Sequence, residues 1–248
     1  MKIGIISLGL IGGSLALRLI EQGFDVYAFT TNKNLILKNG KAFTNYEKLK
    51  ECNIVFICSP LNKILDILKE IQVYITANTI ISDVGSVKSF ICKEAQQIIR
   101  SDCEFIGGHP MAGTEKQGFE NAFPSLFENR SWVLMKENKL LESIIQKTNA
   151  NIVYTCPEKH DQAVAFISHI PLLLSLGLHN LIENIKDPEI KELAQNLAST
   201  GYEGMVRLAK GNQTLNQDLL YFNKENINII FEEFLQETKN KYLSSLGL

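Results

Sequence analysis

A glycine-rich turn directly follows the first apolar run of the chain. Residues 2–7 are rich in apolar side chains, Gly9 and Gly12 come next, and a stretch with helical apolar spacing follows. This arrangement fits the spacing G-x-G-x-x-G between a strand and a helix, with Ser7 at the position of the first glycine. The turn therefore predicts a parallel α/β sheet whose first helix points its N-terminus at a phosphate group.

The residues of this turn have separate physical tasks. Gly9 allows the backbone to approach a pyrophosphate, and Gly12 allows the helix to pack closely on the strand. Ser7 departs from the pattern, so its turn must either accept a negative φ or carry some strain. The alternative is a glycine-rich packing turn without a ligand. We expect a dinucleotide to be bound by Gly9, Leu10, Ile11 and Gly12.

The second expected strand, 25–30, ends without a carboxylate. An NAD site usually places an acidic side chain here, where it binds the ribose hydroxyls. This chain instead has Thr30, Thr31, Asn32 and Lys33, which suit a 2′-phosphate. The sequence thus favours NADP. NAD stays possible, because a plain polar strand end would leave the preference undecided.

Short apolar runs alternate with amphipathic ones up to residue 154, whereas residues from 157 onward form long apolar-periodic segments. Alternation of this kind predicts βα units and a mostly parallel sheet. We expect a domain over 1–156 and an all-helical domain over 157–248. The expected strands are 2–7, 25–30, 53–59, 79–83, 104–106, 131–135 and 151–155, and the expected helices of the first domain are 12–22, 62–74, 87–100 and 139–149.

Composition excludes several classes of protein. The formal net charge is −2 and no long cluster of lysine and arginine occurs, so a nucleic-acid partner is not expected. The five cysteines include no C-x-x-C pair, which indicates reduced thiols in the cytoplasm and no zinc site. The most apolar segment, Val164–Leu178, contains polar residues and is shorter than the roughly 20 apolar residues of a membrane span. We expect a buried helix there and no membrane partner.

Two further strand ends carry small and polar residues. Ser59 and Pro60 follow one strand, and Asp83, Gly85 and Ser86 lie at or beyond the end of the next. The carboxyl ends of parallel strands face the ligand crevice, so we expect these residues to flank the cofactor. Ser86 is a candidate for the catalytic site, or equally for the N-cap of the helix expected from Val87.

A histidine stands between glycines and a proline in the segment Gly107-Gly108-His109-Pro110-Met111-Ala112-Gly113. Core packing gives little reason for a histidine there, whereas an imidazole beside a cofactor can accept the proton of a hydroxyl group that is being oxidised. The segment resembles the signature of the prephenate/arogenate dehydrogenase family of tyrosine biosynthesis. Further matches are the segments 83–88, 160–165, 168–171 and 194–199, and the short form is most similar to cyanobacterial-type arogenate dehydrogenases.

The resemblance implies an N-terminal Rossmann-type nucleotide-binding domain and a helical dimerisation domain that forms a homodimer. It also implies that His109 accepts the proton of the ring hydroxyl, that Ser86 binds near the same hydroxyl, and that Arg207 binds a substrate carboxylate. Glu203 stands where relatives have a cation. If Arg207 lies off the pocket, Lys210 or Arg130 would have to supply the positive charge that binds the carboxylate. The expected reaction is NADP-dependent oxidative decarboxylation of arogenate to tyrosine.

Other roles and functions remain open at this stage. His169 is either a buried histidine or part of the substrate pocket, and Glu115 either supports His109 or is a surface acid. Thr114 is a further candidate for substrate binding. The sequence shows no convincing metal site. Leu172 occupies a place where many prephenate-using relatives carry a second histidine, which favours arogenate over prephenate. A non-catalytic NADP-sensing protein is a remote alternative, because it would have no use for a combined Ser86, His109 and Arg207.

Overall fold

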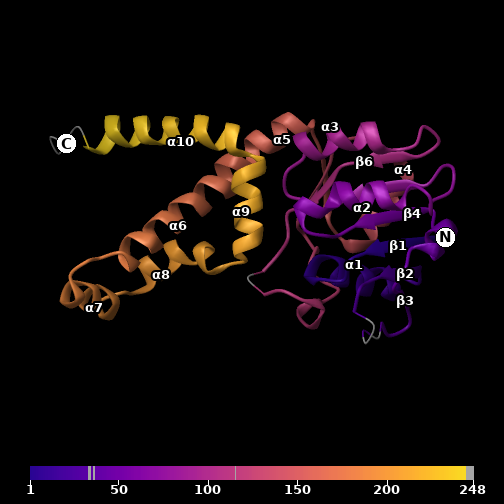
Figure 1. The fold of residues 1–248 in the computed structure, drawn as a ribbon, viewed down its shortest axis with the longest axis horizontal. Coiled ribbons are helices and arrows are strands. Elements are labelled where there is room, and N and C mark those ends of the chain that lie inside the picture. Colours follow the sequence, from indigo (N-terminus) through magenta and orange to yellow (C-terminus); the bar gives the residue numbers. More distant parts are fainter. Residues whose placement is uncertain (33–34, 36, 115, 244–248) are drawn as a thin grey trace. The chain divides into compact units, whose positions relative to one another are not determined.

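The computed structural model describes the chain except for residues 33, 34, 36, 115 and 244–248. The chain divides into two compact units, Met1–His160 and Asp161–Leu248 (Figure 1). We refer to them as the nucleotide unit and the helical unit. The division lies inside helix α5 (Pro157–Val164).

A six-stranded parallel sheet forms the centre of the nucleotide unit. Its strand order is β3-β2-β1-β4-β5-β6, the order of the Rossmann fold. The central strands are buried over most of their length because helices cover a parallel sheet, which is why they are nearly continuous runs of apolar residues. The strands are β1 (Lys2–Ile6), β2 (Asp25–Phe29), β3 (Lys41–Phe43), β4 (Ile54–Ile57), β5 (Ile80–Asp83) and β6 (Glu104–Ile106).

Helices connect these strands and share one apolar core with them. Leu15 and Leu19 of α1 and Ile3 and Ile5 of β1 belong to this core and are fully buried. The connecting helices are α1 (Leu10–Glu21), α2 (Ile64–Ile71) and α3 (Ser89–Ile98), with 3₁₀ turns at Glu47–Glu51 and Leu61–Lys63. The arrangement confirms the predicted Rossmann-type fold of the first part of the chain.

A second, three-stranded sheet completes the nucleotide unit. Strand β7 (Gly108–Pro110) pairs antiparallel with β8 (Ser131–Leu134), which pairs parallel with β9 (Asn151–Tyr154). Helix α4 (Lys139–Ile145) joins β8 to β9, and further 3₁₀ turns span Phe119–Asn121 and Gln146–Thr148. The sequence predicts strands at 131–135 and 151–155 but not that they leave the main sheet, and it does not predict β7 or β3.

Helices alone make up the described part of the helical unit. They are α6 (Ile170–Glu183), α7 (Pro188–Asn196), α8 (Thr200–Val206), α9 (Gln213–Phe222) and α10 (Lys224–Thr238), with a 3₁₀ turn at Leu208–Lys210 and π-helical turns at Ala165–His169 and Lys239–Leu243. Ala165, Ile170, Ile227 and Ile230 form its small buried core. The predicted all-helical character is confirmed.

The helical segment Pro157–Glu183 is, among the described residues, long and apolar enough to cross a membrane by length and composition alone. Only 28% of its most apolar window is buried in the structure, so the burial that we predicted for this segment is incomplete within one chain. A core helix of a water-soluble protein passes the same test, which makes the segment weak evidence for a membrane span.

Candidate functional site

Ser7 stands in a left-handed backbone conformation, with φ of 71°. The sequence left a negative φ or strain as alternatives, and the structure shows the strained one, because a residue with a Cβ is disfavoured in this region. The backbone N–H of Ser7 donates to the carbonyl of Phe29 at 2.9 Å. A Cβ on Gly12 would lie 2.1 Å from the carbonyl oxygen of Ser7, so only glycine fits at position 12.

The N-terminus of α1 provides the features that a pyrophosphate requires. Gly9 is the N-cap, no side chain caps the helix, and no acidic residue stands in the first turn. A Cβ placed on Gly9 would meet nothing within 4 Å, so the backbone at Gly9 faces open space. Leu10 packs into the core, while Ile11 is partly exposed. Unsatisfied N–H groups at a helix N-terminus attract phosphate, so the residues present fit a dinucleotide.

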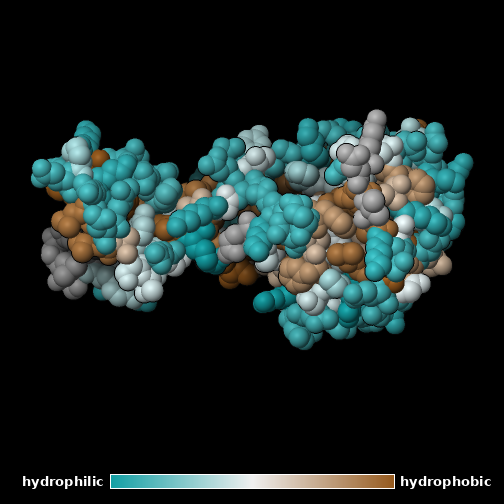
Figure 2. All heavy atoms as spheres, turned by 90° about the horizontal axis from the view of Figure 1, so that it is seen from below, coloured by the Kyte–Doolittle hydropathy of each residue, from teal (hydrophilic) through white to brown (hydrophobic). Residues whose placement is uncertain are grey.

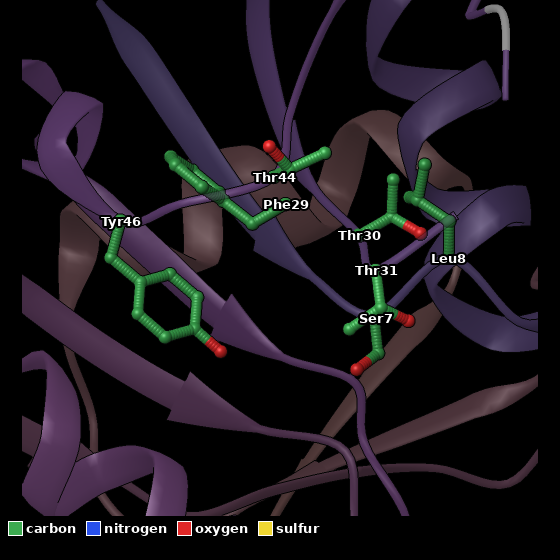
Figure 3. A pocket seen from close by; sticks show the side chains of 7 residues that line it. All are labelled: Ser7, Leu8, Phe29, Thr30, Thr31, Thr44 and Tyr46. Atoms are coloured by element: carbon green, nitrogen blue, oxygen red, sulfur yellow. The ribbon is translucent and has the colours of Figure 1, made fainter. Parts of the chain in front are cut away.

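A cavity of about 190 Å³ lies at the ends of β1 and β2. Figure 3 shows the hydroxyl-bearing side chains of Ser7, Thr30 and Thr31 near one another, with Tyr46 at the other end of the view. Its lining contains hydroxyl groups and apolar side chains but no carboxylate among the described residues: Ser7, Leu8, Phe29, Thr30, Thr31, Thr44 and Tyr46. The cavity thus offers polar groups to a ribose or its phosphate and places no negative charge there.

The residues after β2 are only partly described. The backbone N–H of Asn32 donates to the Thr30 hydroxyl at 3.1 Å, and Asn32 and Thr31 are exposed. Lys33 lies outside the described residues. Thr44 and Tyr46, which the sequence analysis did not single out, follow the short strand β3. Burial raises the pKa of the Tyr46 hydroxyl, with a further contribution from the charge of Glu70, so this phenol is a neutral hydrogen-bonding group.

Two serines meet where the order of the main sheet reverses. The Ser7 and Ser59 hydroxyl oxygens are 2.5 Å apart, across the ends of β1 and β4. Ligands of open α/β sheets bind outside the carboxyl ends of the strands at this switch point. Ser59 is buried and Pro60 is exposed. Burial also raises the pKa of the neighbouring Cys58 thiol, which keeps it protonated.

A buried ion pair holds the loop that leads to His109. The side chains of Asp83 and Lys88 are both 0% exposed and form an ion pair. The Asp83 carboxylate accepts the N–H groups of Gly85 at 2.9 Å and Gly108 at 3.2 Å, and Lys88 donates to the carbonyl of Gly108 at 2.8 Å. Both polar backbone groups of Gly108 are thereby fixed. We call this set, Asp83, Lys88 and Gly108, the β7 clamp.

The β7 clamp changes the expected role of Asp83. The sequence predicts direct contact with the cofactor, whereas the structure buries the carboxylate completely and engages both its oxygens. Asp83 therefore shapes the backbone around Gly85 and Gly108. Ser86 is partly exposed, and α3 begins only at Ser89 with Lys88 at its N-cap, so Ser86 does not cap this helix.

His109 meets a second histidine, His160, which the sequence analysis did not single out as a site residue. The Nδ1 atom of His109 lies 2.9 Å from Nε2 of His160, and the ring centroids are 5.1 Å apart. His109 is partly exposed on β7, while His160 is 3% exposed in the first turns of α5. The two residues are 51 positions apart in the sequence, which is why local patterns gave no signal for their contact.

Candidates on the loop after β7 remain predictions. The Thr114 hydroxyl accepts the backbone N–H of Lys116 at 3.2 Å, and Thr114 is exposed. Glu115 lies outside the described residues. Within the ranges that the structure covers, no three His, Cys, Asp or Glu residues are grouped so that they could hold a metal ion.

The helical unit contains the remaining predicted residues. His169 is 1% exposed and its Nδ1 lies 3.0 Å from the amide nitrogen of Asn223. Because an amide nitrogen only donates, Nδ1 of His169 accepts and its proton resides on Nε2. Arg207 is exposed at the C-cap of α8, Glu203 is exposed on α8, and Leu172 is buried. Of the substitute cations, Lys210 belongs to the helical unit and Arg130 to the nucleotide unit, and both are exposed.

Comparisons with known proteins agree with this arrangement. The family described as "Prephenate dehydrogenase, nucleotide-binding domain" matches residues 17–154, and "Prephenate dehydrogenase, dimerization domain" matches 156–243. The prephenate dehydrogenase of Lactococcus lactis is 31% identical over the whole chain and 70% of its own length. That of Bacillus subtilis is 31% identical over 93% of this chain, which spans 66% of the length of that relative.

Solved structures show the same similarity. Synechocystis arogenate dehydrogenase has a TM-score of 0.83 and 33% identity, over 97% of this chain and 90% of that one. A. aeolicus prephenate dehydrogenase, in complex with hydroxyphenyl propionate and NAD+, has a TM-score of 0.88 and 25% identity, over 100% of this chain and 92% of that one. The similarity therefore extends over both units of the chain.

Proposed function

The chain belongs to the prephenate dehydrogenase family, and from this premise we propose that it is an arogenate dehydrogenase that uses NADP to convert arogenate to tyrosine. The observation that carries the proposal is the position of His109, held on β7 by the β7 clamp at the end of a nucleotide-binding sheet. An oxidoreductase of this family needs a base beside its cofactor, and a partly exposed imidazole with a fixed backbone suits that role.

The chain's own residues position the reacting groups. A bound nicotinamide would accept the hydride from the ring carbon that carries the hydroxyl group. His109 takes the proton of that hydroxyl group, and the O–H electron pair forms the carbonyl bond. The bond between the ring and its carboxylate then breaks to release CO₂, its electron pair completes the aromatic ring while the carbonyl π pair returns to the oxygen, and that oxygen takes up a proton to give the phenol. Ser86 holds the hydroxyl group, and Arg207 binds a substrate carboxylate through paired hydrogen bonds, with Thr114 as a further substrate contact. His169, which is 1% exposed, is the buried histidine of the two alternatives. These assignments are proposals for the residues named.

The preference for NADP rests on the cavity beside Thr30 and Thr31. Its described lining has hydroxyl groups where an NAD site usually places a carboxylate, so a 2′-phosphate meets no repulsion. Replacing Thr31 with Asp should weaken NADP binding relative to NAD by at least about tenfold, because it adds a negative charge beside the phosphate. An unchanged ratio of the two dissociation constants, measured by fluorescence titration, would remove the support for this preference.

Arogenate and prephenate differ in the side chain, which carries an ammonium group in the first and a keto group in the second. Leu172 is buried and apolar at the place where the resemblance puts a histidine in many prephenate-using relatives. This favours arogenate. Prephenate stays the alternative, since the two relatives compared above are named prephenate dehydrogenases.

A homodimer formed through the helical unit is the proposed assembly. Leu181 of α6, Ile190 and Leu193 of α7, and Leu197 directly after α7 are each more than half exposed. Figure 2 shows hydrophobic residues at the surface of this unit. An exposed apolar patch of this kind marks a protein interface. Replacing Leu193 and Leu197 with Asp should shift the sedimentation coefficient from that of a dimer to that of a monomer, and a monomeric wild-type chain would contradict the proposal.

The five reduced cysteines favour a cytoplasmic location.

Initial rates on arogenate and prephenate, each with NADP and with NAD, test the function directly. The proposal predicts the highest kcat/KM for arogenate with NADP. A higher value for prephenate would replace the proposed substrate with the alternative, and no turnover of either substrate would contradict the enzymatic function. His109→Asn is the matched control, because it removes the base while leaving the cofactor cavity intact.

A further inference from the structure

The hydrogen bond between His109 and His160 is built by the topology of the three-stranded sheet. His109 lies on β7 opposite Val133 of β8, and β9 lies on the other side of β8. The chain leaves β9 and enters α5, where the backbone N–H of His160 donates to the carbonyl of Cys156 at 3.0 Å. The first turns of the helix thereby place the ring of His160 next to β7.

The two rings differ in their access to solvent. His160 is 3% exposed, so its ring is enclosed by protein, whereas His109 is partly exposed. The planes of the two rings are 73° apart, and the contact runs from Nδ1 of His109 to Nε2 of His160. This geometry makes His109 the member of the pair that a ligand can reach, and it makes His160 its support.

One proton must lie between these two nitrogen atoms for them to form a hydrogen bond. If Nε2 of His160 carries it, Nδ1 of His109 is the acceptor and the neutral ring of His109 holds its own proton on Nε2, where it cannot accept another. If Nδ1 of His109 carries it, Nε2 of His109 presents a lone pair. Only the second arrangement gives a base at Nε2. The partner of a catalytic imidazole therefore selects its tautomer.

We propose that His160 is a positioning residue that accepts the Nδ1 proton of His109 and so holds His109 in the tautomer with an unprotonated Nε2. This inference rests on the proposed function of His109 as the base. When Nε2 takes the proton of the substrate hydroxyl group, the ring becomes an imidazolium, and the same hydrogen bond to His160 becomes charge-assisted and stronger. His160 exchanges no proton with the substrate and forms no covalent bond in this scheme.

Nuclear magnetic resonance reads the tautomer without depending on turnover. The experiment uses the full chain with ring-¹⁵N-labelled histidine and saturating NADP+, and the His109 signals of the four histidines are assigned by their loss in His109→Asn. We expect the His109 proton on Nδ1 in the wild-type protein. A His109 ring that is protonated on Nε2 overturns the proposal, whatever the activity of the enzyme.

Two substitutions of His160 separate positioning from packing. His160→Phe keeps a ring but lacks the acceptor, and we expect kcat to fall about 100-fold with KM for substrate within about threefold. His160→Gln places an amide oxygen near the former Nε2, and we expect it to retain kcat within about tenfold of wild type. His179→Phe, on α6, is the matched control and should leave both kcat and the His109 signals unchanged.

The outcomes distinguish this inference from the proposed function. A wild-type value of kcat in His160→Phe, or equal losses in His160→Phe and His160→Gln, overturns the positioning role. If His109→Asn also keeps its activity, the proposed role of His109 as the base fails. If His109→Asn is inactive while His160→Phe is active, only the inference fails. Fluorescence of Trp132, the chain's single tryptophan, checks that each variant folds.

Discussion

Removal of the Lys88 charge tests whether the β7 clamp stabilises the nucleotide unit. In Lys88→Met the carboxylate of Asp83 stays buried and, among the described residues, retains the N–H groups of Gly85 and Gly108 as partners. An uncompensated buried charge costs about 3–5 kcal/mol in the free energy of unfolding. That is a large share of the roughly 5–15 kcal/mol by which a folded domain is stable. We therefore expect a much less stable nucleotide unit.

A double-mutant cycle isolates the contribution of the pair. Asp83→Asn alone leaves the Lys88 ammonium group buried with the carbonyl of Gly108, so it should cost a similar amount. The double variant contains neither charge, so it should lose less than the sum of the two single losses. We expect a coupling energy of about 1–3 kcal/mol.

Urea unfolding followed by tryptophan fluorescence measures the free energy of unfolding of the nucleotide unit, which contains the β7 clamp. Trp132 is the single tryptophan and is fully buried. Its indole nitrogen would lie 3.3 Å from a Cβ built on Gly108, so the fluorophore is next to the β7 clamp. Lys136→Met removes the surface pair with Glu104 as a control and should cost at most about 1 kcal/mol. A Lys88→Met loss as small as this control, or additive single losses, would refute the reasoning.

Three further changes have defined outcomes. Gly12→Ala places a Cβ against the carbonyl of Ser7, so it should lower the stability by about 1–3 kcal/mol in thermal unfolding and weaken NADP binding in titration; wild-type binding would contradict this. Hydrogen bonds from Lys2, then from Lys48, lower the pKa of Glu51 from 4.5 to about 2. Stability from this group is complete above pH 4.5 and falls as the pH decreases toward 2, so Glu51→Gln should flatten the acid limb of Tm against pH, and an unchanged limb would refute it. Asp187→Ala removes the side-chain cap of α7 and should cost about 1 kcal/mol in urea unfolding, with no loss counting against the cap.

Burial explains which parts of the fold the sequence predicts. β1 and β4 are enclosed by protein, so they are nearly continuous apolar runs, and their positions agree with the predicted strands. β3 is three residues long and mostly exposed, and β7 consists of Gly108, His109 and Pro110, so neither has a strand pattern. The separation of β8 and β9 into their own sheet depends on pairing between distant segments, which local periodicity does not encode.

The sequence predicts only part of the candidate site, because one part is a local motif and the other depends on contacts between distant segments. The turn at Gly9 and Gly12 is a local motif with a fixed geometry, so its place follows from the sequence. The contact of His109 with His160 depends on the path of the chain through three strands, and the two residues are 51 positions apart, so no local pattern predicts it. Tyr46 lines the cavity because it follows the unpredicted strand β3.

The turnover of His109→Asn on arogenate with NADP tests the central claim that this imidazole is the base. Binding of NADP should stay within about threefold of wild type, while kcat falls by about 100-fold or more, because a positioned general base contributes about 10²–10⁴ to the rate. Undiminished kcat in a variant that still binds NADP would contradict the account.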